Sequence, residues 1–331
     1  MTLPGRFVAV WSIFTLCTYL SFGSGLQLLH LGWGLWAAQA LFHGGLSVVG
    51  WQLSGHSARA ALGGFSARSF GVGAAFGAAN YFAWAVPLMA LAHAVFPARL
   101  VQFFDSAKLF ERHSQVDLAL AVSGAVLAAP LCEELFFRGF LQRGFREAPR
   151  GIVLTALIFS ACHFDPVGLL ARFELGVLFG LLAWKSGSVW PAVGAHAANN
   201  GVTTLLYFLG DAGDDTPLGW KLPLLCFAAG NLALLALTRF AGEHLRSPSP
   251  STLTPVPPRT PWAWFSPWLA WGLASFLLLL AFDWRGVALN VIDARAQPGE
   301  AVRTQTRTLR ARARAGELPL SDYRQALRPP N

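Results

Sequence analysis

Long apolar segments recur along this chain, and they restrict its fold more than any other feature. The segments cover residues 7–25, 32–53, 70–96, 117–142, 150–164, 169–185, 191–209, 218–238 and 262–282. A helix needs about 20 apolar residues to cross the hydrocarbon core of a bilayer. Because backbone polar groups in lipid must satisfy one another, such segments fold as helices. We therefore predict an all-α polytopic transmembrane helical bundle of about eight core helices plus one extra C-terminal apolar segment.

The composition supports a membrane protein. Of the 331 residues, 54% are hydrophobic and only 13% are charged, whereas about 25% of the residues in soluble domains are charged. The net charge of +8 comes mostly from arginine, since lysine occurs only three times. The basic residues lie between apolar segments or in the C-terminal tail, so we expect contact with the lipid bilayer and no nucleic-acid partner.

The loop charges predict the orientation. Loops 54–69, 138–150 and 239–260 are basic, whereas loop 210–217 is acidic. Basic loops are retained on the cytoplasmic side, so the amino terminus and these three loops are expected inside. The bias toward arginine and alanine is typical of a GC-rich bacterial genome. We therefore expect a multi-pass protein of a bacterial inner membrane.

The chain divides into four regions. Residues 1–246 form the predicted helical core, which includes the motif region 117–209 described below. Residues 247–261 are a linker rich in Pro, Ser and Thr, which cannot sustain a helix. The additional hydrophobic segment 262–284 follows, and then the arginine-rich tail 285–331, expected to be disordered or bound to a surface. The charge pattern leaves open whether 262–282 spans the membrane and on which side the tail lies.

Polar side chains gather in four successive spans, 117–142 to 191–209. They are Glu133, Glu134, Arg138, His163, Asp165, Arg172, Glu174, His196, Asn199 and Asn200. A charged side chain at the centre of a bilayer costs at least ~2.5–3.5 kcal/mol. So many costly groups in neighbouring spans indicate a functional site, and the clustering in one half of the chain argues against a transporter built from inverted repeats.

The spacing of these residues separates their roles. Glu134 and Arg138 are four residues apart, so they share a helix face and can neutralise each other. Glu133 is rotated by about 100° and has no cation on its own helix. His196 and Asn200 also share one face. Measured from the basic residues at the span ends, Glu133, His163 and His196 reach depths of about 15–20 Å. Taken singly, each histidine could be a packing residue, Asn200 a helix–helix contact, and the Glu134–Arg138 pair structural.

Three short motifs resemble those of one protease family. EELFFR at 133–138, FSACH at 159–163 and HAANN at 196–200 resemble the EExxxR, FxxxH and HxxxN motifs of the CPBP intramembrane endopeptidases. This family is also called the CAAX-protease and bacteriocin-processing, or Abi, family. The resemblance extends over about 117–209, and its strength lies in the order of the three motifs on successive predicted helices.

The resemblance implies a glutamate-type intramembrane protease that needs no cofactor. Glu133 would be the general base that activates water, and His163 would assist or hold that water. His196 and Asn200 would donate hydrogen bonds to the tetrahedral oxyanion, where each donor is worth ~2.7–4 kcal/mol in comparable sites. Glu134 and Arg138 would support the site. Its substrates would be membrane-associated proteins or peptides.

Two alternatives remain open at this point. Glu133, His163 and His196 could form a His₂Glu zinc site, the ligand set of some metalloproteases, although the chain has no HExxH motif. The protein could also be a non-catalytic immunity factor or scaffold on the same fold. We predict a metal-free endopeptidase that acts near the cytoplasmic face in CAAX-type, sorting or maturation processing.

Overall fold

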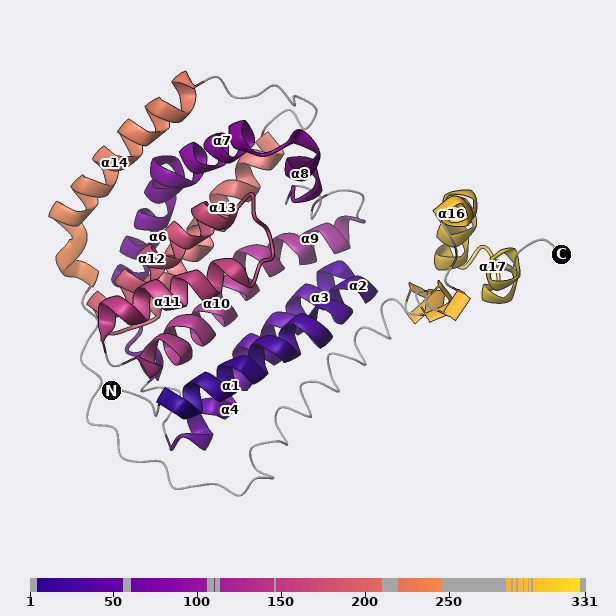
Figure 1. The fold of residues 1–331 in the computed structure, drawn as a ribbon, viewed down its shortest axis with the longest axis horizontal. Helices are drawn as coiled ribbons and strands as arrows, with labels where there is room; N and C mark the ends of the chain where they lie inside the picture. The colour runs from indigo at the N-terminus through magenta and orange to yellow at the C-terminus, as the bar shows by residue number, and fades with distance from the viewer. Residues whose placement is uncertain are drawn as a thin grey trace.

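The computed structural model is a bundle of helices (Figure 1). It describes residues 5–55, 61–105, 110, 114–145, 147–209, 220–245, 284–286, 288, 289, 291–293, 295, 296, 298 and 300–327. These residues contain no β-strand, and the all-α prediction is confirmed. The linker 247–261 and the apolar segment 262–282 lie outside the described residues, so their predicted roles remain predictions.

The first two apolar segments form a helical hairpin. The first run comprises α1 (Gly5–Thr18), the π-helical segment η1 (Tyr19–Gly23) and α2 (Ser24–Leu29). The second comprises α3 (Leu31–Ala38), the π-helical segment η2 (Gln39–Gly45) and α4 (Leu46–Leu53). His30 separates them in an extended conformation, and its Nδ1 accepts a hydrogen bond from the Trp33 N–H. Such a cap satisfies a donor that a helix start leaves free.

The third apolar segment is one long helix. It comprises α6 (Ala67–Asn80), η3 (Tyr81–Ala85) and α7 (Val86–Val95), and the short α8 (Ala98–Phe103) follows. Helix α6 packs closely against α13 (Trp190–Leu209) through glycine. A Cβ at Gly77 would lie 2.0 Å from the Ala195 carbonyl oxygen, so only glycine permits this approach. The contact fixes α13 beside the rest of the bundle.

The motif region forms four helical runs. The first comprises α9 (Gln115–Ser123), η5 (Gly124–Ala128), α10 (Ala129–Glu134), η6 (Leu135–Leu141) and η7 (Gln142–Gly144). The others are α11 (Ala148–Ala161), α12 (Leu169–Ser186) and α13. Helix α14 (Lys221–Ala241) and the short turn η8 (Gly242–Leu245) close the bundle. Each of the first eight predicted spans thus overlaps a helical run.

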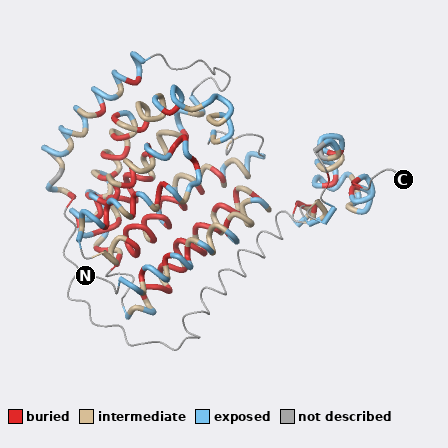
Figure 2. The backbone as a smooth tube through the Cα atoms, in the orientation of Figure 1, coloured by how far each residue is buried: buried red, intermediate tan, exposed pale blue. Residues whose placement is uncertain are grey.

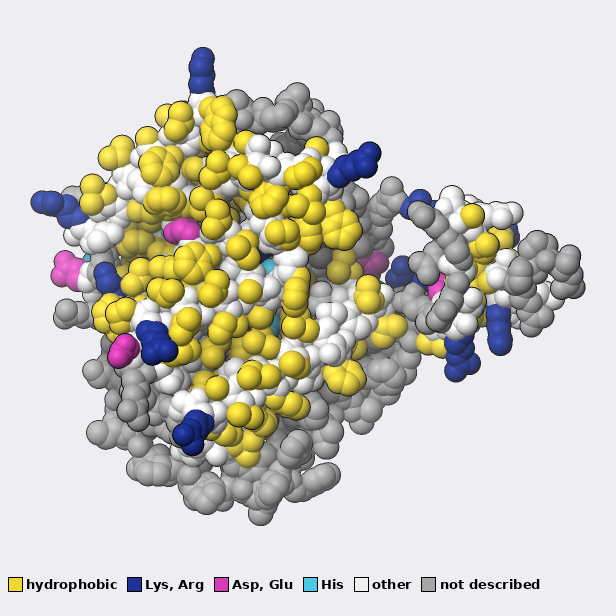
Figure 3. All heavy atoms as spheres, viewed as in Figure 1, with side chains coloured by type: hydrophobic (Ala, Val, Ile, Leu, Met, Phe, Trp, Pro, Cys, Tyr) yellow, Lys and Arg dark blue, Asp and Glu magenta, His cyan; other side chains and the backbone are white. Residues whose placement is uncertain are grey.

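Four of these runs are long and apolar enough to cross a membrane. They are Gly5–Leu29, Ala67–Val95, Gln115–Gly144 and Lys221–Arg239. The buried residues lie where the helices face one another, and much of α14 is exposed (Figure 2). The face of the bundle shown in Figure 3 is largely covered by hydrophobic side chains, with Lys and Arg near its edges. An apolar exterior of this kind fits a protein that lies in the bilayer.

The described part of the arginine-rich tail is helical. Helices α16 (Glu300–Ala315) and α17 (Leu320–Ala326) lie to one side of the bundle (Figure 1). They enclose a small core of Leu289, Ala313, Tyr323 and Leu327. Burial raises the pKa of Tyr323 to about 12, and its hydroxyl donates to Asp293 at 2.8 Å. The sequence did not lead us to expect this small unit, because its apolar residues are few and scattered among arginines.

Candidate active site

The carboxylates of the first motif lie on a helix with an altered winding. Helix α10 is flanked by two π-helical segments, η5 before it and η6 after it. Pro130 lies in the first turn of α10 and has no N–H to donate. Wide turns of this type are frequent at functional sites, since they change the direction of the side chains that follow. The winding presents Glu133 and Glu134 to different neighbours.

Glu134 lies at the centre of a buried charge cluster. Its Oε1 accepts from Arg138 Nη1 at 2.9 Å and lies 2.9 Å from Nδ1 of His196. Arg138 also donates from Nη2 to the Gly176 carbonyl at 2.9 Å. Both side chains of the Glu134–Arg138 pair are fully buried. The predicted pairing is therefore present, and Glu134 has the further contact with His196 on α13.

Aromatic rings enclose this cluster. The Arg138 guanidinium lies 4.8 Å from the ring centre of Phe159 and 5.2 Å from that of Phe179. The imidazole of His196 stacks on Phe179, with ring centres 4.8 Å apart. Cations over aromatic faces are stabilised electrostatically, more strongly when water is excluded. These rings therefore hold Arg138 and His196 in fixed positions.

Glu133 has separate partners, as its rotation on the helix predicts. Its Oε1 accepts a hydrogen bond from Gln39 Nε2 at 2.7 Å. Its Oε2 lies 4.0 Å from Nε2 of His196. The residue is buried, with 6% of its surface exposed. His196 thus lies between two carboxylates, one at each ring nitrogen.

His163 follows the end of α11. Its Nδ1 lies 2.8 Å from the Phe159 carbonyl oxygen, which can only accept, so the hydrogen is on Nδ1 and a neutral ring has a free lone pair on Nε2. The ring meets Phe159 edge-on, and Phe159 also contacts His196. Asp165 stabilises the next turn, since its Oδ1 accepts from the Val167 and Gly168 N–H groups.

Asn200 contacts the helix of the first motif at a different point. Its Nδ2 donates to the Ala125 carbonyl at 2.9 Å, and its Oδ1 accepts from Asn199 at 3.3 Å. The structure thus ties α13 to η5 through Asn200. One amide hydrogen of Asn200 is engaged in this contact, and the role of Asn200 in binding an oxyanion stays a prediction.

The N-terminal hairpin supplies polar groups that our sequence interpretation missed. Gln39 contacts Glu133, His43 Nδ1 lies 2.8 Å from Gln39 Oε1, and the Tyr19 hydroxyl lies 3.3 Å from Gln39 Nε2. Gln39 and His43 are four residues apart in an apolar span, a signal that the sequence contained. The polar groups are therefore not restricted to one half of the chain.

A metal site would need several His, Cys, Asp or Glu side chains close together among the described residues. Within them, no group of three or more His, Cys, Asp and Glu side chains is placed to hold a metal ion. The possible zinc ligands have other partners, since Glu133 accepts from Gln39 and His196 Nδ1 contacts Glu134. The metal-free mechanism remains a prediction for experiment.

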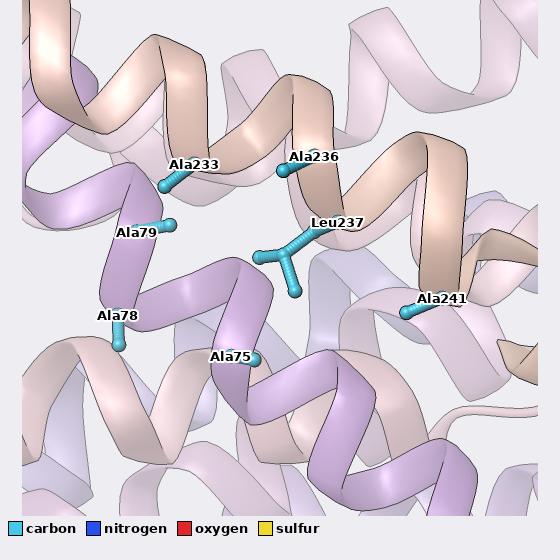
Figure 4. A pocket seen from close by; sticks show the side chains of 7 residues that line it. All are labelled: Ala75, Ala78, Ala79, Ala233, Ala236, Leu237 and Ala241. Carbon is cyan, nitrogen blue, oxygen red and sulfur yellow. The ribbon is translucent and has the colours of Figure 1, made fainter.

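An apolar groove lies elsewhere, between α6 and α14 (Figure 4). It has a volume of about 540 Å³. Its lining consists of Ala75, Ala78, Ala79, Ala233, Ala236, Leu237 and Ala241. Because none of these side chains has a polar group, the groove offers no acid–base chemistry and is distinct from the cluster around Glu133.

The fold and the buried cluster define an integral membrane protein with a glutamate–histidine site between its helices. Residues 115–202 match the family model described as Rce1-like, type II CAAX prenyl endopeptidase Rce1-like. This match confirms the resemblance inferred from the three motifs, and the segment carries a domain of the CAAX-protease family. The chain matches no curated protein and no solved structure. At the family level, this match supports an assignment as a CAAX-type intramembrane protease.

Proposed function

We propose that this protein hydrolyses a peptide bond of membrane-associated protein substrates, with Glu133 as the general base. The observation that carries the proposal is the position of Glu133. Its Oε1 is held by Gln39, whereas its Oε2 faces His196 Nε2 across 4.0 Å. General bases must lie within hydrogen-bond reach of the proton that they remove, directly or through one water. A water beside Oε2 would meet both Glu133 and His196.

The reaction follows from this placement. Glu133 Oε2 accepts a proton from the water, and the water oxygen attacks the carbonyl carbon of the substrate. The tetrahedral intermediate then loses its amine, which takes the proton from Glu133. The products are a carboxylic acid and an amine. The lone pair on His163 Nε2 suits the second role implied by its motif, because it can accept the other hydrogen of the water.

His196 is suited to stabilise the developing oxyanion. Glu134 and Arg138 form an ion pair, so the Glu134 carboxylate accepts at His196 Nδ1. Nε2 can then donate to an oxyanion only when the ring is an imidazolium. In that form the charges of Arg138 and His196 balance those of the two glutamates. Donors fixed before the reaction need no reorganisation in the transition state.

The substrate class and the orientation are part of the proposal. The family description names a prenyl endopeptidase, and we propose substrates processed near their C-termini, in CAAX-type, sorting or maturation processing. The basic loops favour a multi-pass inner-membrane protein of a bacterium with the site toward the cytoplasm. Histidine atoms show through the apolar surface near the middle of one face of the bundle (Figure 3), where a substrate could approach from the bilayer.

The test compares protein termini in membranes that contain either the wild type or Glu133→Gln. We expect new termini in the wild-type membranes only. Glu174→Gln is the matched control, since Glu174 is a partly buried carboxylate in the motif region but contacts Asn80. The control should retain cleavage. Identical termini in wild-type and Glu133→Gln membranes would refute the proposal and favour a non-catalytic scaffold.

Metal dependence is tested on the same membranes. We expect the wild-type fragments to persist after treatment with a strong chelator, because the proposed chemistry uses only side chains and water. Cleavage that is lost on chelation and restored by zinc would overturn the metal-free mechanism. It would favour the His₂Glu alternative instead.

A further inference from the structure

The N-terminal hairpin holds Glu133 through Gln39, which in turn contacts His43 and Tyr19. Gln39 Nε2 lies 2.7 Å from Glu133 Oε1, and His43 Nδ1 lies 2.8 Å from Gln39 Oε1. Gln39 and His43 are 1% and 4% exposed. Distances of this length belong to well-formed hydrogen bonds, and the bond to an ionised carboxylate is among the stronger kinds. None of these hairpin residues belongs to the three motifs.

The direction of each hydrogen bond follows from chemistry. An ionised Glu133 can only accept, so the Gln39 amide must present its NH₂ group to Oε1. The Gln39 carbonyl oxygen then faces His43, whose Nδ1 must carry a hydrogen. In a neutral ring the other nitrogen, Nε2, is left as an acceptor, and this atom is buried without a hydrogen-bond partner. A protonated Glu133 could still accept from Gln39 through its carbonyl oxygen, but a hydrogen bond to the ionised carboxylate is stronger, so this arrangement favours the ionised form.

Aromatic packing keeps these side chains in place. The His43 ring stacks on Tyr19 and on Phe136, with ring centres 4.1 and 5.4 Å apart. The Tyr19 hydroxyl accepts from Gln39 at 3.3 Å and from Gln27 at 3.4 Å. A buried ring between two aromatic faces cannot turn freely, so His43 holds its Nδ1 toward Gln39. The amide of Gln39 is therefore fixed from two sides.

We propose that Gln39 is a positioning residue for Glu133, and that His43 and Tyr19 fix its amide. Gln39 holds Oε1 and stabilises the ionised carboxylate, which leaves Oε2 toward His196 and the attacking water. This inference rests on the proposed function for its catalytic meaning. The N-terminal hairpin is thus part of the site and not only a lipid-facing cover.

Other charged and titratable groups also act on Glu133. Glu134 and Arg138 lie on the same helical run, His196 on α13, and Tyr19, Cys132 and Cys162 interact with it electrostatically. The variants below leave all of these groups except Tyr19 in place. A change in the behaviour of Glu133 in Gln39→Met therefore reports on the lost amide.

The first test measures the protonation of Glu133 without any substrate. Dicyclohexylcarbodiimide reacts with protonated carboxyl groups in apolar surroundings, and mass spectrometry locates the modified residue. In Gln39→Met we expect the midpoint of Glu133 labelling to move to higher pH by about one unit or more, since a hydrogen bond to the charged form is lost. His43→Phe keeps the aromatic stack and should shift the midpoint less, in the same direction. Tyr19→Phe should shift it least.

Gln142→Met is the matched control. Gln142 also donates from the same helical run as Glu133, but its partner is the Gly180 carbonyl. Like Gln39→Met, this control replaces a glutamine amide by an apolar side chain of similar length. Its labelling midpoint should coincide with that of the wild type. A Gln39→Met midpoint equal to that of the wild type and of Gln142→Met would overturn the inference.

The second test separates this inference from the proposed protease function. With a substrate found from the membrane termini, Gln39→Met should lower kcat about 10-fold to 100-fold with little change in KM, and should move the acidic limb of the kcat profile to higher pH. A shifted labelling midpoint without any cleavage in the wild type would support the role of Gln39 and refute the protease. Cleavage that depends on Glu133 but is unchanged in Gln39→Met would support the protease function and refute the role of Gln39.

Discussion

The N-terminal hairpin and the motif region contribute to the site in different ways. The motif region, residues 117–209, places Glu133, Glu134 and His196 together through helices α10 and α13. The hairpin, residues 5–53, has no motif residue, yet its Gln39 donates a hydrogen bond of 2.7 Å to Glu133. Groups that react must have a defined chemistry, whereas a group that positions them needs only a donor at the right point. Short motifs therefore reveal the first kind and not the second.

The comparison is tested most strongly by Glu133→Gln in the motif region. The amide keeps the size of the side chain and cannot accept a proton. The rate of cleavage should therefore fall by about 10²-fold to 10⁴-fold, the range of general acid–base catalysis. The rate of fragment formation measures the effect. A variant that retains more than a tenth of the wild-type rate would show that the base lies elsewhere.

Arg138→Met should have the largest effect on stability. Arg138 has no exposed side-chain surface and pairs with Glu134 at 2.9 Å. Removing one member of a buried pair leaves an uncompensated charge, at a cost of about 3–5 kcal/mol. Thermal unfolding in detergent measures the loss.

The matched variant for this prediction is Arg138→Lys. It keeps the charge but cannot bond both Glu134 and the Gly176 carbonyl with the same fork of donors. We expect an intermediate unfolding temperature. A temperature equal to the wild type in both variants would mean that the buried charges do not stabilise the bundle.

On the hairpin side, Gln39→Met should reduce the rate less than Glu133→Gln does. The variant loses a positioning hydrogen bond and keeps the base, so the expected reduction is about 10-fold to 100-fold. At pH values well above the wild-type acidic limb, part of the rate should return, because Glu133 is then ionised without the help of the amide. A loss as complete as that of Glu133→Gln would remove the distinction between reacting and positioning residues.

The smallest effect on stability is expected for the contact between the N-terminal hairpin and the start of the motif region. His30 Nε2 lies 3.1 Å from Asp117, between the hairpin and the start of α9. The Asp117 side chain is 24% exposed, so water screens this pair, and Asp117→Asn should cost no more than about 1 kcal/mol. Thermal unfolding should show a small decrease, with cleavage unchanged. A large loss of cleavage would mean that this contact controls the geometry of the distant site.

Much of the fold could be predicted because a membrane chain must place apolar helices in lipid. The eight predicted core spans follow from runs of apolar residues, and each overlaps a helical run in the structure. The π-helical segments could not be predicted, since they depend on packing between helices. The helices of the tail were also missed. Their small core uses single, scattered residues such as Leu289 and Tyr323, so the sequence of the tail contains no long apolar run.

The site was predictable to the extent that one helix determines it. The spacing of Glu134 and Arg138 predicted their pairing and left Glu133 for other partners. The contact of Glu134 with His196 joins residues 62 positions apart, and that of Gln39 with Glu133 joins residues 94 apart. Contacts over such separations depend on how helices rotate and pack.

The sequence by itself determined the class of this protein, its helical segments and the residues that we propose to carry the chemistry. Hydrophobicity and helical spacing are local properties, so the order of residues is sufficient for them. Only the tertiary structure decided which groups meet. It placed His196 between Glu133 and Glu134, and it brought Gln39 of the hairpin to Glu133. Burial makes each polar group depend on a partner, and the packing of the bundle selects that partner.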